Sequence, residues 1–133
     1  MIDVIDQHDT HETVLMLTNA ALTRKAKDLV ILRVKETTSY TDYFIICSGT
    51  SDRQVKAIAA HIEETLKKSG ILPLGIEGKN IGNWILMDYG EVIVHVFYEP
   101  TREFYDVERL WSDVPSMAIA DTVDKLTALD DGM

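Results

Sequence analysis

The segment "SGTSDRQ" (Ser48 to Gln54) has features of a phosphate-binding loop, because it joins an apolar segment to a helical pattern. Such loops use several glycines, which let backbone N–H groups approach the phosphate, and usually a nearby cation. This segment has one glycine, and Asp52 in the first helical turn competes for the same donors. Ser51 and Gln54 have the spacing of a capping box, which satisfies those donors within the chain. The sequence therefore favours a helix cap over a phosphate site.

Acidic residues are the next candidates for chemistry, because nucleotidyl transfer needs two carboxylates that hold Mg²⁺ from alternate positions of one strand. The expected strands carry no such pair. Asp106 and Glu108 have the spacing but fall in an expected helix, where a two-residue step turns them about 200° apart. Asp88 and Glu91 flank a turn and could meet, although acidic turn residues commonly serve solubility. We expect no catalytic residue and no enzyme; the alternative is a nucleotide-binding or nucleotidyltransferase-type enzyme.

Metal and nucleophile patterns are weak. His8, His11 and Glu12 could contact one metal ion, but His8 precedes the expected helix start, so the geometry is poor. His95 has no serine, cysteine or second histidine at the spacing of a triad. Cys47 lies inside the apolar run "YFIICS" and is expected to be a buried thiol. The sequence therefore predicts no metal and no cofactor.

Size and charge narrow the class of protein. The 133 residues, 46% of them hydrophobic, are enough for one core and a single domain. The net charge of −9 disfavours direct nucleic-acid binding and would attract a basic protein instead. The chain has no apolar run of membrane-spanning length, and "MIDVIDQHDT" carries aspartates where a signal peptide needs basic residues. We therefore expect a cytoplasmic protein that does not enter a membrane.

Hydrophobic periodicity predicts the order α-β-β-α-β-β-β-α, which is typical of a single α/β domain with a mixed sheet and flanking helices. The second helix follows "SGT" and ends at Gly70, and Pro73 places the next short strand at an edge of the sheet. We divide the chain into an α/β domain (1–115) and an acidic C-terminal extension (116–133), in which we expect a short helix with a disordered end. The expected elements are helix 9–27, strands 28–34 and 43–48, the second helix, strand 71–78, a hairpin over 84–99 and helix 101–111.

The hairpin has two different faces. A two-residue turn at Tyr89 and Gly90 would pair Trp84 with His95 and Leu86 with Ile93. Trp84, Leu86, Asp88, Glu91, Ile93, His95 and Phe97 would then share one face, and Ile85, Met87, Val92, Val94, Val96 and Tyr98 the other. The second face is core. The first is either a half-covered sheet face or a protein-binding patch anchored by a tryptophan. In the last helix, we expect Phe104, Val107, Leu110 and Trp111 to be buried.

Several blocks in order resemble the ribosomal silencing factor family (RsfS or Iojap-like), over about residues 29–111. They are "SYTDYFIICSGTSDRQVKAIAAHI", "LPLGIEG" and "WILMDYGEVIVHVFYEPTREFYDVERLW". The last block contains the series W-x-x-x-D-x-G-x-V-x-V-H from Trp84 to His95 and R-x-x-Y-x-x-E-x-L-W from Arg102 to Trp111. The resemblance says nothing about the acidic extension.

The resemblance implies a nucleotidyltransferase-like α/β fold without the catalytic carboxylates. It also implies that the chain binds the large ribosomal subunit through its fourteenth ribosomal protein, blocks association with the small subunit and so represses translation. Family members can self-associate, so a homodimer stays open. We expect the partner-binding residues to be Trp84, Leu86, Asp88, Glu91, His95, Arg102 and Tyr105.

Overall fold

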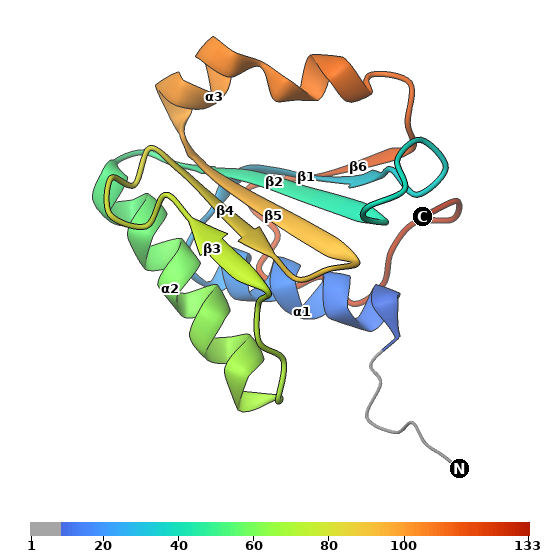
Figure 1. The fold of residues 1–133 in the computed structure, drawn as a ribbon, viewed down its shortest axis with the longest axis horizontal. Helices are drawn as coiled ribbons and strands as arrows, with labels where there is room; N and C mark the ends of the chain where they lie inside the picture. Colours follow the sequence, from blue (N-terminus) through green and yellow to red (C-terminus); the bar gives the residue numbers. More distant parts are fainter. Residues whose placement is uncertain (1–8) are drawn as a thin grey trace.

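One sheet with helices on both of its faces forms the molecule (Figure 1). The computed structural model describes residues 9–133. Its elements are α1 (Thr10–Thr23), β1 (Lys27–Arg33), β2 (Tyr43–Gly49), α2 (Asp52–Lys68), β3 (Gly75–Glu77), β4 (Trp84–Asp88), β5 (Val92–Tyr98), α3 (Glu99–Tyr105), the 3₁₀-helix η1 (Val107–Trp111) and β6 (Ser116–Ile119). This confirms the predicted α/β domain with a mixed sheet and flanking helices. The likeness to nucleotidyltransferases stays a prediction.

The sheet is built around two apolar strands. Its six strands within residues 9–133 lie in the order β3-β4-β5-β2-β1-β6, and β3 is at an edge, as Pro73 predicted. β2 and β5 are parallel neighbours in the middle, while the other pairs are antiparallel. All seven residues of β2 and six of the seven in β5 are buried. Near-continuous apolar sequence is expected where a strand is covered on both faces.

The two faces are covered unequally. On one face α1 and α2 pack against the sheet and form the first core, which includes Leu17, Ile58 and Val94 (Figure 1). The opposite face carries a smaller second core, which α3 and η1 cover. Its buried members are Leu32, Val34, Phe44, Ile46, Ile93 and Phe97. The hairpin faces were therefore assigned correctly, since Trp84 and Leu86 pack on the second core while Ile85 and Met87 lie in the first.

The register of the hairpin differs from the sequence prediction by two residues. Trp84 pairs with Phe97, Leu86 with His95 and Asp88 with Ile93, instead of Trp84 with His95. The turn is centred one residue later than predicted, on Gly90 and Glu91, and Tyr89 N donates to the carbonyl of Val92 across it (2.9 Å). Because side chains alternate with a period of two, this shift leaves the residues of β4 and β5 on their predicted faces. Glu91 was predicted on the Trp84 face, but it lies in the turn and contacts Thr10 of α1.

The expected helix over 101–111 is two elements. Asp106 adopts a left-handed conformation (φ 46°) and ends α3, after which the chain continues as η1. Val107 and Trp111 pack against the second core as expected, but Phe104 and Leu110 are each 79% exposed. The prediction of burial was wrong for these two, because the break at Asp106 ends the single helical periodicity on which it depended.

The C-terminal extension continues the fold. Where we expected a short helix, Ser116–Ile119 form β6, which pairs antiparallel with β1. The chain then passes along α1, where the Asn19 side chain donates to the carbonyl of Leu126 and accepts from its N–H (2.9 and 2.7 Å). Val123, Leu126 and Leu129 pack against the first core. The extension therefore covers apolar surface that the sheet and α1 would otherwise expose.

The start of α2 confirms the cap. Ser51 Oγ accepts from the N–H of Gln54 (3.1 Å), while Gln54 Oε1 accepts from the N–H of Thr50 (2.6 Å), one residue before the position that a standard capping box uses. The Gln54 amide also donates to the carbonyl of Lys25 (3.2 Å). At the other end Gly70, at φ 80°, closes the helix as predicted. The N–H groups of Thr50 and Gln54, which a phosphate at this turn would compete for, thus have acceptors within the chain.

We predict that Ser51→Ala lowers the free energy of unfolding by about 1 kcal/mol, because the N–H of Gln54 loses its acceptor. Asp9→Ala is the matched control, since Asp9 precedes α1 but makes no capping bond through its side chain. Chemical denaturation measures both. An equal loss in the two variants would contradict the role of the Ser51 hydroxyl.

Candidate functional site

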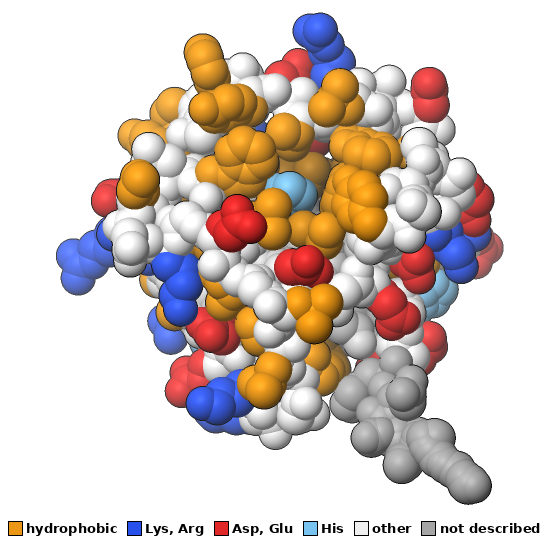
Figure 2. All heavy atoms as spheres, viewed as in Figure 1, with side chains coloured by type: hydrophobic (Ala, Val, Ile, Leu, Met, Phe, Trp, Pro, Cys, Tyr) orange, Lys and Arg blue, Asp and Glu red, His pale blue; other side chains and the backbone are white. Residues whose placement is uncertain are grey.

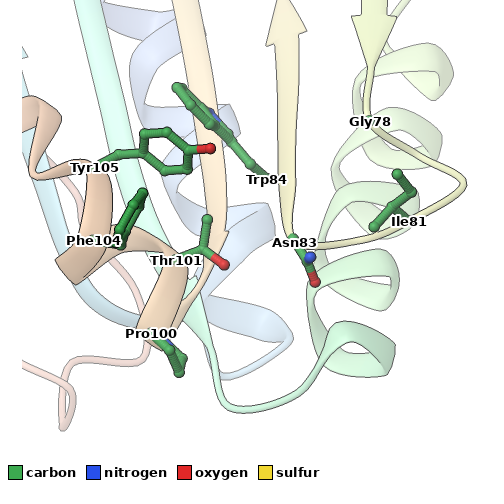
Figure 3. A pocket seen from close by; sticks show the side chains of 8 residues that line it. All are labelled: Gly78, Ile81, Asn83, Trp84, Pro100, Thr101, Phe104 and Tyr105. Carbon is green, nitrogen blue, oxygen red and sulfur yellow. The ribbon is translucent and has the colours of Figure 1, made fainter.

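A groove lies between α3 and the loop that joins β3 to β4. It is a hollow of about 430 Å³. We call it the Trp84 groove; its lining residues are Gly78, Ile81, Asn83, Trp84, Pro100, Thr101, Phe104 and Tyr105 (Figure 3). Figure 2 shows hydrophobic side chains gathered on this side of the molecule, with acidic groups at their border. An apolar hollow on an open face is typical of a binding surface.

Two glycines shape the loop on one side of the groove. Gly78 has φ 86°, and a Cβ at this residue would lie 2.1 Å from the carbonyl oxygen of Trp84. Gly82 has φ 80° and packs against Lys56 of α2. Side chains are therefore excluded at both positions, and the loop lies close against the sheet and α2. Ile81, between them, is left 68% exposed at the border of the groove.

Trp84 stands at the centre of an aromatic cluster. Its ring centroid lies 4.8 Å from that of Phe97 and 5.2 Å from that of Tyr105. The indole Nε1–H donates to Nδ1 of His95 (3.1 Å). Tyr105 stays 55% exposed, and Phe104 packs against it edge to face at 5.0 Å. These rings give the groove a rigid apolar wall that leaves aromatic surface open to a partner.

His95 lies beneath this wall and is 9% exposed. It contacts the rings of Phe44 (5.2 Å) and Phe97 (6.1 Å) as well as that of Trp84. Burial among these rings lowers the pKa of His95 from 6.5 to about 4, so the imidazole is neutral at pH 7. A neutral ring that accepts at Nδ1 carries its proton on Nε2.

Arg102 fixes α3 above the sheet. Its guanidinium donates to both carboxylate oxygens of Glu108 (2.8 and 2.9 Å) and to Ser48 Oγ at the end of β2 (2.8 Å). In one continuous helix, side chains six residues apart would point about 120° away from each other. The bidentate pair therefore requires the break at Asp106, and it connects α3, η1 and β2. Hydrogen bonds to Glu108 raise the pKa of Arg102 despite the opposing effect of burial, so the cation persists.

The seven expected partner-binding residues divide by position. Trp84 and Tyr105 line the groove, and Leu86 lines a smaller adjoining hollow of about 290 Å³ with Glu77. His95 and Arg102 are internal supports; only 13% of the Arg102 side chain is exposed. The carboxylates of Asp88 and Glu91 have different partners: Asp88 Oδ1 accepts from Gly90 N (2.8 Å), and Glu91 accepts from Thr10 Oγ1 (2.9 Å).

Sequence reasoning missed part of the groove. Ile81 lies between the expected strand 71–78 and the hairpin and was not among the candidates, and Phe104 was expected in the core. Residue type gave no signal for Ile81, because isoleucine is among the residues most often buried. No local signal identified Phe104, since its exposure depends on the conformation of Asp106.

The metal candidates do not form a site in the part of the chain that is described. His8 lies outside the described residues. His11 Nε2 contacts the hydroxyl of Tyr43 (2.8 Å) and the main-chain oxygen of Met133 (3.0 Å). Among residues 9–133, no three His, Cys, Asp or Glu side chains are placed to share an ion. Cys47 is fully buried, and burial raises its pKa to about 12.

We predict that His95 makes the protein less stable in acid. The pKa of His95 is lowered from its ordinary value of 6.5 to about 4 in the folded protein, so below pH 6.5 the unfolded chain binds a proton that the folded chain does not bind. The contribution of His95 to the free energy of unfolding is fully present above pH 6.5. It falls by about 3 kcal/mol as the pH approaches 4. Denaturation from pH 7 to 4 measures this loss, which should shrink in His95→Asn. Equal losses in the two proteins would contradict the burial of a neutral imidazole.

Comparisons with known proteins identify the family. The model of "Ribosomal silencing factor during starvation" matches residues 7–131, so it includes all but the last two residues of the extension. The ribosomal silencing factor RsfS of Halalkalibacterium halodurans is 36% identical over 108 residues, which are 81% of this chain and 92% of that protein. A mouse protein named mitochondrial assembly of ribosomal large subunit protein 1 is 35% identical over 100 residues, 73% of this chain and 44% of the mouse chain. The crystal structure of a Chromobacterium violaceum protein has a TM-score of 0.78 at 35% identity, covering 88% of this chain and 98% of that one. The chain belongs to the ribosomal silencing factor family.

Proposed function

We propose that the protein binds the large ribosomal subunit through the Trp84 groove and thereby prevents the small subunit from joining. The family supports a ribosomal target, as does the name of the mouse relative, which refers to large-subunit assembly. The observation that carries the choice of surface is the exposed aromatic wall of Phe104 and Tyr105 beside Trp84. Aromatic anchors in a preformed hollow are the usual energetic centre of a protein interface.

The proposed contact on the subunit is its fourteenth ribosomal protein, as the family resemblance implies. A net charge of −9 favours a basic protein surface over RNA, and it speeds encounter with such a partner. A domain of 133 residues is roughly 35 Å across, so once docked on the joining surface it occupies space that the small subunit must enter. Translation falls because subunits are kept apart.

This mechanism works by exclusion, so it needs no cofactor and no direct contact with nucleic acid. The protein acts beside ribosomes in the cytoplasm. Among the described residues, no helix is both long enough and apolar enough to cross a bilayer.

A second copy of the chain is the competing occupant of the groove, because the same apolar wall could be buried in a homodimer.

We predict that Phe104→Ala weakens binding to purified large subunits at least tenfold, while Leu110→Ala leaves it unchanged. Both side chains are 79% exposed and lie in the same covering segment, but Phe104 alone of the two lines the groove. A tenfold loss of affinity corresponds to about 1.4 kcal/mol of binding free energy, a modest value for a truncated aromatic contact, whereas substitution at the exposed surface barely changes stability. Co-sedimentation and thermal unfolding of both variants measure the two effects.

Trp84→Ala should weaken binding more strongly, by roughly thirtyfold, and should also restore subunit joining in a light-scattering assay. Raised salt should slow association more than it speeds dissociation. If folded Phe104→Ala and Trp84→Ala proteins bind and block joining like the parent, the groove is not the ribosomal contact. Gel filtration of the same variants shows whether the substitutions change self-association through the groove.

We also predict that the purified protein neither hydrolyses nor transfers nucleotides. None of the six strands in residues 9–133 carries two acidic side chains, and Asp88 and Glu91 have separate partners. Magnesium therefore lacks the paired carboxylates that this chemistry requires. Calorimetry with ATP and a turnover assay test this. Metal-dependent turnover that survives repurification and disappears in Asp88→Ala would refute it.

A further inference from the structure

We propose that His95 is a positioning residue, which holds the Trp84 indole in the one orientation that completes the wall of the Trp84 groove. The inference rests on the proposed function, because it concerns how the same surface keeps its shape. It assigns His95 an indirect part, in place of the direct contact with a partner that the sequence suggested.

His95 cannot offer much surface to a partner. It is 9% exposed and does not line the groove, while Trp84 and Tyr105 do. Its own neighbours are the rings of Phe44, Trp84 and Phe97. Any effect of His95 on binding must therefore pass through the side chains above it, and Trp84 is the one that it hydrogen-bonds.

The hydrogen bond selects between two orientations of the indole. Rotation about the bond between Cβ and the ring has two broad preferred states. Packing against the tilted rings of Phe97 and Tyr105 restricts the ring plane, but it has little preference for which edge faces inward. The bond from Nε1–H to Nδ1 of His95 (3.1 Å) does distinguish the edges, since turning the ring over moves the donor away from its acceptor. A partly buried donor left without an acceptor is unfavourable.

The hairpin register is compatible with this bond. Leu86 is opposite His95 and Trp84 is opposite Phe97, so Trp84 and His95 are diagonal neighbours on one face. A diagonal separation of about 7 Å lies within reach of an aromatic side chain that leans along the strand. The acceptor must also be a neutral imidazole, since a protonated ring has no free lone pair. Burial among aromatic rings keeps it neutral at pH 7.

The test uses three substitutions. His95→Leu removes the acceptor and keeps apolar bulk, His95→Asn places an amide oxygen near the position of Nδ1, and Trp84→Phe removes the donor and keeps an aromatic ring. The chain has two tryptophans, so ¹⁵N-labelled protein gives two indole N–H signals, and the one that disappears in Trp84→Phe belongs to Trp84. Thermal unfolding verifies that each variant is folded.

We expect His95→Leu to shift the Trp84 indole signal, to speed its hydrogen exchange and to weaken large-subunit binding roughly five- to tenfold. His95→Asn should restore most of the signal position and most of the affinity. In the Trp84→Phe background, the change from His95 to Leu should no longer affect binding. If His95→Leu does not fold, His95→Asn and Trp84→Phe decide alone, since the first should keep the affinity and the second should lose it.

The inference is overturned if the Trp84 signal is unchanged in His95→Leu, if His95→Asn binds as weakly as His95→Leu, or if His95→Leu still weakens binding in the Trp84→Phe background. The spectra do not depend on ribosomes. Failure of the parent protein to bind large subunits would refute the proposed function, while the spectra would still decide the role of His95.

Discussion

The structure depends on one constraint: the parallel pair β2 and β5 is apolar on both faces, so both faces of the sheet must be covered. Two long helices satisfy this on the first core. On the second core, the elements that residues 9–133 supply are α3 and η1, which together span residues 99–111. This short segment covers Phe44 and Phe97 but leaves the edge above β4 open. The Trp84 groove lies between α3 and the loop that joins β3 to β4, where the second core is no longer covered.

The position of the short cover is set by polar contacts. α3 and η1 contain no buried residue, so apolar packing alone orients them poorly. Arg102 supplies the missing restraint by joining Glu108 on η1 to Ser48 at the end of β2. The left-handed Asp106 lets both elements contact the sheet. Phe104 and Tyr105 are then held at the border of the groove, a preformed arrangement that lowers the entropic cost of binding.

The parts of this arrangement that are local in sequence could be predicted. The cap at Ser51, the closing Gly70 and the two faces of the hairpin each depend on a pattern of a few residues, and the structure confirms them. Family membership followed from separated motifs and is confirmed as well. The hairpin register and the exposure of Phe104 were predicted wrongly. The register depends on the backbone conformation of the turn, and the exposure of Phe104 depends on that of Asp106. Residue periodicity determines neither. The strand in the extension and its packing on α1 were not predicted, because the pairing of β6 with β1 and the contacts of Asn19 join residues far apart in the sequence.

The central claim is that the groove beside Trp84 is the surface that meets the large subunit. Hydrogen–deuterium exchange of the protein, free and bound to purified large subunits, tests it without any substitution. The account predicts slower exchange in residues 78–86 and 99–105, which surround the groove, and unchanged exchange in the exposed parts of α2 on the opposite face. Protection confined to α1 and α2, with the groove segments unaltered, would contradict it.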